Sequence, residues 1–237
     1  MNTAWPAAAK YSVWRLFELV CASVGLLLLS PLFAVLALAV LLFSGRPVLF
    51  SQARMGRYAV QFRIWKFRTM HTGAAGPAIT ADGDSRVTVI GRWLRKFKLD
   101  ELPQLFNVLR GDMSVVGPRP EVPQYVNLRS PLWHAVLQVR PGITDLATLI
   151  YRDEEKLLRT SGDADRLYRE TVLPAKLRLN LAYLQTRCFW QDMRLIWLTV
   201  RYSLSPKGFN PACIHRGFMT GVENGGHLHS ISSAIDR

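Results

Sequence analysis

The stretch LDELPQLFNVLRGDMSVVGPRP, residues 99–120, decides how the fold is organised. It opens with two adjacent carboxylates, Asp100 and Glu101, and closes with a Gly-Pro-Arg-Pro turn whose prolines fix the backbone on both sides of Arg119. Between these ends, apolar residues recur at helical spacing. The pattern predicts a short helix that begins at the carboxylates and ends at Arg110-Gly111-Asp112.

The position of the two carboxylates has a chemical consequence. The N-terminus of a helix carries free N–H groups and the positive end of the helix dipole, which suits a phosphate. Consecutive helical residues point in different directions, so Asp100 and Glu101 are expected to differ in role: one could attack a substrate while the other handles protons or a metal. The alternative is structural, with Asp100 as an N-cap and Glu101 as a first-turn charge.

The amino-acid composition limits the kinds of partner that the chain can bind. The chain has 237 residues, enough for one domain or for a domain plus a membrane element, and its net charge of +13 favours anionic partners. Its basic residues are interleaved with Trp, Phe and Leu, which favours a membrane surface or a folded phosphate site over a disordered arm. Three widely spaced cysteines predict no disulfide framework and fit a reducing compartment.

A long uncharged segment, residues 19–45, consists mostly of Leu, Val, Ala and Phe and predicts a membrane element. As a straight helix it would be about 40 Å long, more than the hydrocarbon core of roughly 30 Å. Pro31 cannot donate to the carbonyl of Leu27, so we expect a kink there, and the Ser30 hydroxyl could satisfy a freed carbonyl. The segment is too long for a signal-peptide core and has no A-x-A cleavage site, so we expect it to be retained.

Two topologies fit this segment: a kinked helix that spans the bilayer, or a re-entrant hairpin that enters and leaves by the same face. Basic residues flank both ends, namely Lys10 and Arg15 before it and Arg46, Arg54 and Arg57 after it. By the positive-inside rule both ends are then cytoplasmic, which favours the re-entrant, monotopic arrangement.

Two strands are predicted next, at residues 48–50 and 60–70, joined around residues 54–57 as a β-hairpin. The alternation of apolar residues slips in phase along the second strand, which predicts a bulge or strand end near Lys66. Residues 72–85 are small, polar and rich in turn formers, and predict a mobile surface loop near the carboxylates.

Two later segments predict helices that could lie against lipid. Residues 86–98 form a basic amphipathic stretch, read either as a helix in the headgroup region or as a surface helix packed on a core. The membrane segment favours the first interpretation, which puts the carboxylates that follow at headgroup depth. Residues 173–204 carry a long helical periodicity with a turn near residues 189–192, and the same two interpretations stay open for them.

Five motifs, taken in order, resemble the bacterial sugar transferase family, the small monotopic phosphoglycosyl transferases. They are the Ser30-Pro31 break, PVLFSQARMG from Pro47, WKFRTM from Trp65, IGRWLRKFKLDELPQLFNVLRGDMSVVGPRPE from Ile90 and VRPGIT from Val139. The match is nearly collinear to about Leu204. It implies a re-entrant helix broken at Ser30 and Pro31, with the catalytic domain at the cytoplasmic face of the bacterial inner membrane.

The resemblance also implies a reaction. Members of the family move a sugar 1-phosphate from a nucleoside diphosphate sugar to polyprenyl phosphate, the first membrane step of exopolysaccharide, O-antigen, lipopolysaccharide or glycoconjugate synthesis. We therefore expect a UDP-sugar donor, undecaprenyl phosphate as acceptor, contact with membrane lipid, Mg²⁺ as cofactor and no nucleic acid partner.

Asp100 and Glu101 match the family's Asp-Glu pair. By that correspondence, Asp100 attacks the phosphate that bears the sugar and forms a covalent phosphosugar intermediate, which polyprenyl phosphate then displaces. Glu101 would orient or polarise, and Arg119 would bind a phosphate oxygen bidentately. The candidate Mg²⁺ ligands are Asp100, Glu101 and, more weakly, Glu121. Further substrate-binding candidates are Lys66, Arg68, Arg92, Arg95 and Arg110.

The chain departs from the family pattern at two places. After VRPGIT many members continue with Gly, whereas this chain has Asp145, followed by a charged YRDEE insertion from Tyr151. The hairpin turn has Arg57-Tyr58-Ala59 where members often carry a second glycine. Neither change touches the Asp-Glu pair, and we expect the minimal catalytic form, with no further transmembrane domain before the membrane segment.

The predicted fold is α+β and mainly helical, with a small β-hairpin and interfacial amphipathic helices around the catalytic site. We expect a membrane-associated re-entrant helix over residues 1–46, a cytoplasmic-face catalytic domain over residues 47–206 and a disordered Gly-, Ser- and His-rich tail over residues 207–237.

Two other classes of function compete with the enzyme. A membrane-anchored basic module could hold anionic lipid or nucleic acid without chemistry, but it gives no reason for DELPQL and GPRP to flank one short helix. An ordinary glycosyltransferase would require a separate nucleotide-binding α/β domain, and no alternating series of strands and helices of that size is visible in the sequence.

Overall fold

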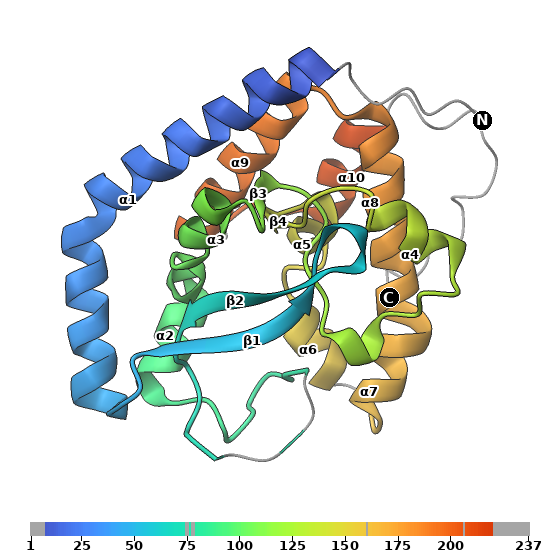
Figure 1. Ribbon diagram of the computed structural model, residues 1–237. Helices are drawn as coiled ribbons and strands as arrows, with labels where there is room; N and C mark the ends of the chain where they lie inside the picture. Colours follow the sequence, from blue (N-terminus) through green and yellow to red (C-terminus); the bar gives the residue numbers. More distant parts are fainter. Residues whose placement is uncertain (1–7, 74–75, 77–78, 160, 206, 220–237) are drawn as a thin grey trace.

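The computed structural model describes residues 8–219, except 74–75, 77–78, 160 and 206. The described chain is mainly helical, with two small two-stranded sheets and one long apolar helix at its N-terminal end. Figure 1 shows this helix, α1, along one side of the molecule, next to a β-hairpin and the remaining helices. The prediction of a mainly helical α+β fold is therefore confirmed.

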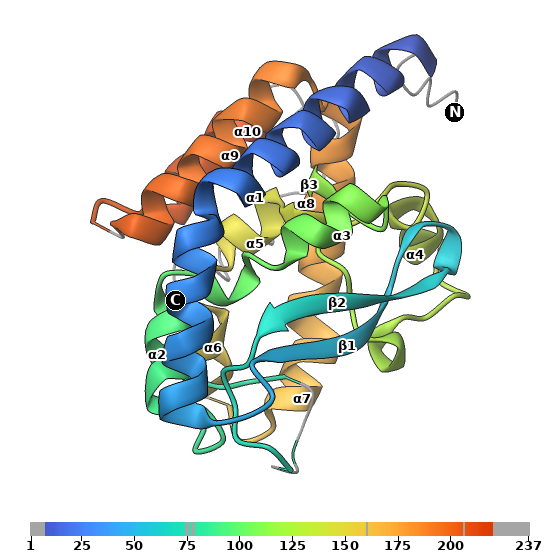
Figure 2. The same ribbon diagram turned by 60° about the vertical axis from the view of Figure 1, so that its left-hand side comes forward.

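Helix α1 spans Ala8–Ser44 and is long and apolar enough to cross a membrane. It contains Pro31 and bends near its middle, as the two views in Figure 1 and Figure 2 show. Ser30 Oγ donates a hydrogen bond of 2.8 Å to the carbonyl of Leu27, the group that Pro31 leaves without its helical donor. The predicted kink and the predicted role of the Ser30 hydroxyl are confirmed.

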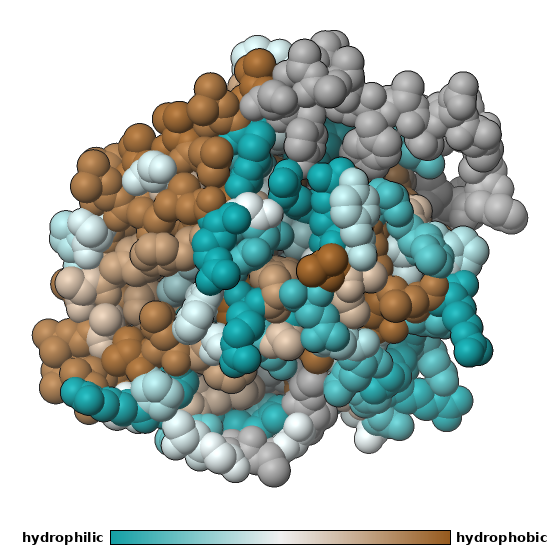
Figure 3. Space-filling model, in the orientation of Figure 1, coloured by the Kyte–Doolittle hydropathy of each residue, from teal (hydrophilic) through white to brown (hydrophobic). Residues whose placement is uncertain are grey.

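Most of the apolar surface of α1 is exposed. Ala22, Leu36 and Val40 are buried against the rest of the chain, whereas Leu27 and Leu28 are more than 70% exposed (73% and 72%). Figure 3 shows this exposed side as a hydrophobic surface along the left of the molecule. An apolar helix of this length with so much exposed surface indicates membrane association.

The predicted hairpin consists of β1 (Leu49–Met55) and β2 (Gln61–Phe67), joined by a 3₁₀ turn. Its antiparallel register runs unbroken from Leu49↔Phe67 to Met55↔Gln61. Of the two alternatives predicted near Lys66, the bulge is wrong and the strand end is confirmed, because β2 ends at Phe67. The phase slip arises because this end of β2 is covered on both faces. Ile64 packs into one core cluster with Val108, and Phe67 packs into another with Leu94.

The predicted amphipathic helix is α2 (Val89–Lys96), which begins after the N-cap Thr88. A left-handed residue, Lys98 (φ 57°), then leads into a 3₁₀ turn, η2 (Leu99–Glu101), and helix α3 (Gln104–Arg110) follows. The carboxylates therefore lie in their own turn, and the prediction that one helix begins at them is wrong. Pro103 is the cause, because it has no N–H for the helical ladder.

Helix α3 ends at Gly111, whose φ of 89° is left-handed, in agreement with the predicted exit. Strand β3 (Ser114–Val116) follows and pairs in parallel with β4 (Gly142–Thr144). The carboxyl ends of parallel strands lie at the same edge, so the residues after β3 and after β4 are neighbours.

Helices make up the second half of the described chain. They are α4 (Pro131–Val136), α5 (Leu146–Ile150), α6 (Glu154–Arg159), α7 (Ala164–Leu167), α8 (Leu173–Thr186), α9 (Phe189–Leu204) and α10 (Pro211–Met219). The turn between α8 and α9 lies at Arg187 and Cys188, ahead of the predicted position at residues 189–192.

Helix α10 lies where the sequence predicted a disordered tail, so that prediction is wrong for residues 211–219. Ile214 and Phe218, four residues apart on one helix face, pack into the core with Leu195 and Tyr183. Residues 220–237, whose composition dominated the prediction, lie outside the described residues, as does part of the predicted loop at residues 72–85.

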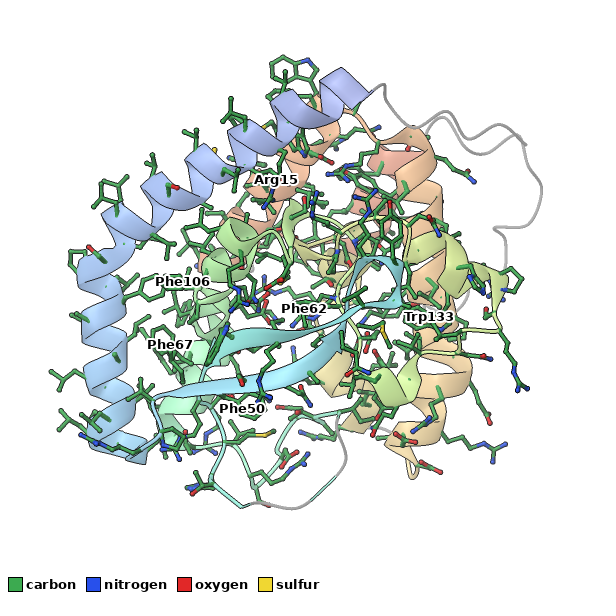
Figure 4. The ribbon with its side chains drawn as sticks, viewed as in Figure 1. Arg15, Phe50, Phe62, Phe67, Phe106 and Trp133 are labelled. Atoms are coloured by element: carbon green, nitrogen blue, oxygen red, sulfur yellow. The ribbon has the colours of Figure 1, made fainter. Side chains whose placement is uncertain are left out.

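Polar anchors join α1 to the rest of the chain. Arg15 donates to the carbonyls of Met113 (3.1 Å) and Val108, and Figure 4 shows it reaching inward from α1. Buried Glu18 accepts hydrogen bonds from Ser114 Oγ and from the backbone N–H of Val115 (3.1 Å).

Aromatic contacts fix the part of α1 that follows the bend at Pro31. The Phe33 ring lies 5.7 Å from the Phe67 ring and 6.4 Å from the Phe106 ring, centroid to centroid, and Figure 4 shows Phe67 and Phe106 directed toward α1. The membrane element is therefore fixed to β2 and α3, the elements that flank the carboxylates.

Candidate active site

Three chain segments meet at the two carboxylates. Asp100 and Glu101, both buried (5% and 8% exposed), come from η2, Lys66 comes from β2 and Arg119 comes from the turn after β3. The sequence stretch quoted first therefore supplies both acids and the arginine, and the hairpin adds the lysine.

Glu101 is held between two cations. Lys66 Nζ donates to Glu101 Oε1 at 2.9 Å, and the Arg119 guanidinium donates to both carboxylate oxygens, with an Nη1–Oε2 distance of 3.1 Å. Burial opposes ionisation of Glu101, but the charges of Arg119 and Lys66 outweigh it and hold the pKa of Glu101 well below its usual range. Burial also lowers the pKa of Lys66 to about 8.

Asp100 is in a different state. Burial, reinforced by the negative charge of Glu101, raises the pKa of Asp100, although Lys66 acts in the opposite direction. Its Oδ1 atom is buried and has no hydrogen-bond partner among residues 8–219 as described. The two acids therefore differ in their hydrogen-bond partners and in the direction of their pKa shifts. That they differ in role stays a prediction.

Two backbone segments that approach each other closely fix the position of Arg119. Gly117 and Gly142 face each other across β3 and β4 so closely that a Cβ on Gly142 would overlap the backbone of Gly117. The N–H of Gly117 donates to Thr144 O (3.0 Å), and the N–H of Gly142 donates to Pro118 O (3.0 Å). Burial opposes the charge on Arg119, but Glu101 raises the pKa of Arg119 above its ordinary value.

Glu121 belongs to a neighbouring cluster that the sequence did not indicate. Tyr168 Oη donates to Glu121 Oε1 at 2.6 Å, and Arg54 Nη1 lies 4.0 Å from Glu121 Oε2 and donates to Pro120 O at 3.1 Å. Burial lowers the pKa of Arg54, and burial together with the charge of Glu121 raises the pKa of Tyr168. No local pattern marks Tyr168, which is 47 residues from Glu121.

The other predicted substrate-binding arginines are not all brought to the carboxylates. Arg68 is buried and donates to the carbonyls of Ser44 and Gly45 (2.8 Å to Gly45), which closes the end of α1. Arg110 is exposed at the far end of α3, 3.5 Å from Asp112, and Arg92 is exposed on α2.

Arg95, on α2, has its hydrogen-bond partners outside the pair of carboxylates. It donates to Thr69 Oγ1, Thr80 Oγ1 and Glu155 Oε1, each at 3.2 Å, and its charge acts on Asp100 in the direction that lowers the aspartate pKa. Lys98 acts on Asp100 in the same direction. Lys66, Lys98 and Arg95 therefore oppose the effect of burial on Asp100, although its pKa stays raised.

The sequence profile of bacterial sugar transferases matches residues 9–206. This chain belongs to the bacterial sugar transferase family. The quoted family motifs converge at the site, because Lys66 of WKFRTM and Arg119 of GPRP both bind Glu101 of DELPQL.

Several bacterial proteins are similar in sequence to this chain. The UDP-glucose:undecaprenyl-phosphate glucose-1-phosphate transferase of Caulobacter vibrioides is 40% identical over 191 residues, 78% of this chain and 67% of the relative. The undecaprenyl-phosphate glucose phosphotransferase of Komagataeibacter xylinus is 39% identical over 197 residues, 79% of this chain and 35% of the relative.

A third relative is closer in length. The exopolysaccharide production protein PSS of Rhizobium leguminosarum bv. phaseoli is 37% identical over 212 residues, 82% of this chain and 97% of the relative. This chain thus spans about a third of the Komagataeibacter protein and nearly all of the Rhizobium protein.

Metal-binding capacity at the site is limited. No three Asp, Glu, His or Cys side chains form a metal-binding group in the part of the chain that the structure describes. The Glu101 oxygens accept from Lys66 and Arg119, and Glu121 binds Tyr168. The unpartnered, buried Oδ1 of Asp100 is an oxygen ligand of the type that Mg²⁺ prefers. The residues therefore fit a magnesium ion that one carboxylate shares with substrate phosphates, the usual mode for Mg²⁺.

Proposed function

We propose that this chain is a polyprenyl-phosphate sugar-1-phosphate transferase, which moves a sugar 1-phosphate from a UDP-sugar to undecaprenyl phosphate. One observation carries the proposal: a buried carboxylate with an unpartnered oxygen, Asp100, lies beside a second carboxylate, Glu101, that two cations hold ionised. The names of the Caulobacter and Komagataeibacter relatives, with undecaprenyl phosphate in both, support it.

The reaction divides into two displacements at one phosphorus. First, a carboxylate oxygen of Asp100 attacks the phosphorus that bears the sugar, and the bond from that phosphorus to the bridging oxygen breaks, so that UMP leaves with the electron pair. Second, a phosphate oxygen of undecaprenyl phosphate attacks the same phosphorus, and the acyl-phosphate bond breaks. Asp100 returns as a carboxylate and the lipid carries a sugar diphosphate.

The surrounding residues have separate tasks in this scheme. Lys66 and Arg119 supply positive charge where the donor's diphosphate adds negative charge, the largest electrostatic need of phosphoryl transfer. Glu101 holds both cations in place before substrate arrives, which keeps them preorganised. The raised pKa of Asp100 keeps its carboxylate weakly stabilised, and therefore ready to share its oxygen with phosphorus.

Magnesium is part of the proposal. Asp100 would hold the magnesium ion, together with phosphate oxygens of the donor. Glu101 and Glu121 would act on the ion indirectly, through the cations and hydrogen bonds around them. When bound, the ion would neutralise phosphate charge and make the nucleotide a better leaving group.

We further propose that α1 is re-entrant, with both ends at the cytoplasmic face of the bacterial inner membrane and α2 at headgroup depth. The bend at Pro31, the Ser30–Leu27 hydrogen bond and the exposed Val89 and Trp93 of α2 support this topology. Replacing Ser30 and Pro31 by Leu and Ala should favour a spanning helix. Cysteine-accessibility labelling of the N-terminus in spheroplasts should then change sides, and an unchanged label would refute the re-entrant model.

The activity is tested by measuring released UMP across a panel of UDP-sugars, with undecaprenyl phosphate and Mg²⁺ in detergent or nanodiscs. We expect UMP release that depends on the acceptor and disappears in Asp100→Asn. Product identity is checked by extracting the lipid, because exopolysaccharide synthesis would require a lipid-linked sugar diphosphate. A purified, folded chain that releases no UMP from any donor would overturn the proposal.

A further inference from the structure

A further buried acid lies against the backbone of Arg119 and takes no part in the scheme above. Asp145 directly follows β4 and is 2% exposed. Its Oδ2 accepts hydrogen bonds from the backbone N–H of Arg119 (2.6 Å) and from Asn180 Nδ2 (3.1 Å), while its Oδ1 accepts from the backbone N–H of Thr148.

Helix capping accounts for only one of these three hydrogen bonds. Asp145 is the N-cap of α5, and that task needs the single bond from Thr148 N–H to Oδ1. Asp163 caps α7 in the same way, through one bond of 3.0 Å from Arg166 N–H to its Oδ1, and is exposed. The second oxygen of Asp145 is therefore engaged outside α5, on the turn that carries Arg119.

The turn that carries Arg119 has few other backbone hydrogen-bond donors. Pro118 and Pro120 have no N–H, so Arg119 supplies the only backbone donor among these three residues. Parallel pairing of β3 and β4 brings the turn next to Asp145, and the carboxylate takes this donor. The direction of the Arg119 side chain, which reaches Glu101 with both terminal nitrogens, depends on the backbone at this point.

We propose that Asp145 is a positioning residue for the reaction: it fixes the backbone of Arg119 so that the guanidinium is already aimed at the diphosphate of the donor. This inference rests on the proposed function. The charge of Asp145 also acts on the arginine, since it adds to the effect of Glu101 in raising the pKa of Arg119 against burial.

Two substitutions separate positioning from capping. Asp145→Ser retains a side-chain oxygen that can cap α5 but has no second oxygen for Arg119 N–H. Asp145→Asn retains the cap and sets an NH₂ group against the N–H of Arg119 and the NH₂ of Asn180. We expect the donor KM to rise about tenfold in both variants, in line with the loss of a hydrogen bond to a charged group, while kcat changes less. Asp163→Ser, the matched cap variant, should leave the donor KM unchanged.

A double-mutant cycle with Arg119→Ala gives the decisive readout. Alanine keeps the backbone N–H but has no guanidinium to aim, so Asp145→Ser should raise the donor KM only when Arg119 is present, while its effect on the melting temperature stays the same in both backgrounds. An equal KM effect with and without Arg119, or no KM effect in Asp145→Ser, would overturn the positioning role. Failure of the proposed function would look different, because the wild-type chain would then release no UMP.

Discussion

The Glu121 cluster and the Asp100 cluster, two of the buried carboxylate clusters in the described chain, differ in how many of their carboxylate oxygens have a partner. In the Glu121 cluster, Tyr168 donates to one carboxylate oxygen and Arg54 lies 4.0 Å from the other. In the Asp100 cluster, Glu101 takes the cations and Asp100 keeps a buried oxygen that has no partner among the described residues. Native proteins rarely leave a buried carboxylate oxygen unbonded, so the comparison supports the proposal that Asp100 is the reactive group and Glu121 a supporting one.

The largest expected effect is at Asp100. Asp100→Asn removes the nucleophile and should lower UMP release by roughly 10³-fold or more, as loss of a covalent nucleophile does in other enzymes. The melting temperature should stay the same or rise, because burial already disfavours the charged carboxylate. Asp112→Asn, at the other end of α3, is the control and should retain activity. Near-normal turnover in Asp100→Asn would reverse the assignment of the two clusters.

Arg119→Ala comes next. It removes a bidentate donor from Glu101 and positive charge from the site, and kcat/KM for the donor should fall on the order of 10²-fold, similar to the loss of one preorganised donor elsewhere. Steady-state kinetics with donor varied check this, and circular dichroism confirms the fold. Wild-type kinetics in Arg119→Ala would exclude the arginine from the site.

The pH profile tests the same contrast with a smaller effect. Asp100 must be ionised, and its pKa is raised, so kcat/KM should fall as the pH drops toward a value above the ordinary aspartate pKa of about 4. Lys66 must be charged, so kcat/KM should also fall as the pH rises through about 8. Lys66→Arg should remove this basic limb while retaining the acid limb. A basic limb that persists in Lys66→Arg would belong to another group.

The pH dependence that Lys66 gives to folding stability should be opposite to the one it gives to activity. The unfolded lysine keeps its proton up to about its ordinary pKa of 10.5, whereas the folded one, whose pKa burial lowers, releases it at about 8. Between these values the unfolded state binds more protons, so this group makes stability rise with pH while activity falls. Chemical denaturation at pH 7.5 and 9.5, compared between wild type and Lys66→Arg, isolates this contribution.

Tyr168→Phe has the smallest expected effect on activity. It removes the donor to Glu121 Oε1 and should destabilise the fold by about 1–3 kcal/mol, the cost of an unsatisfied buried acceptor, with kcat changed by less than about threefold. Urea unfolding and UMP release measure the two quantities. A large loss of kcat with unchanged stability would move Glu121 from support to chemistry.

Local chain signals accounted for much of the fold. The bend at Pro31 follows from its missing N–H, the hairpin from strand propensity, and α2 from its apolar period. The acids and Arg119 could be identified because they lie within one stretch of 22 residues, 99–120. These features depend on neighbours in sequence, which the sequence displays directly.

The missed features depend on contacts between distant residues. Tyr168 meets Glu121 from 47 residues away, and Asp145 reaches Arg119 from 26 away, so no local pattern marks them. Arg68 shares a motif with Lys66 but lies just past the end of β2 and binds the carbonyls of Ser44 and Gly45 at the end of α1, a contact between segments that the motif does not display.

The proposed mechanism requires a covalent bond between Asp100 and the sugar phosphate, which mass spectrometry detects. The full chain is incubated with the UDP-sugar alone, quenched in acid, digested and analysed. The account predicts the added mass of the sugar phosphate on the peptide that contains Asp100, its loss on adding undecaprenyl phosphate, and its absence in Asp100→Asn. Full turnover by an enzyme whose Asp100 peptide never carries this mass would contradict it.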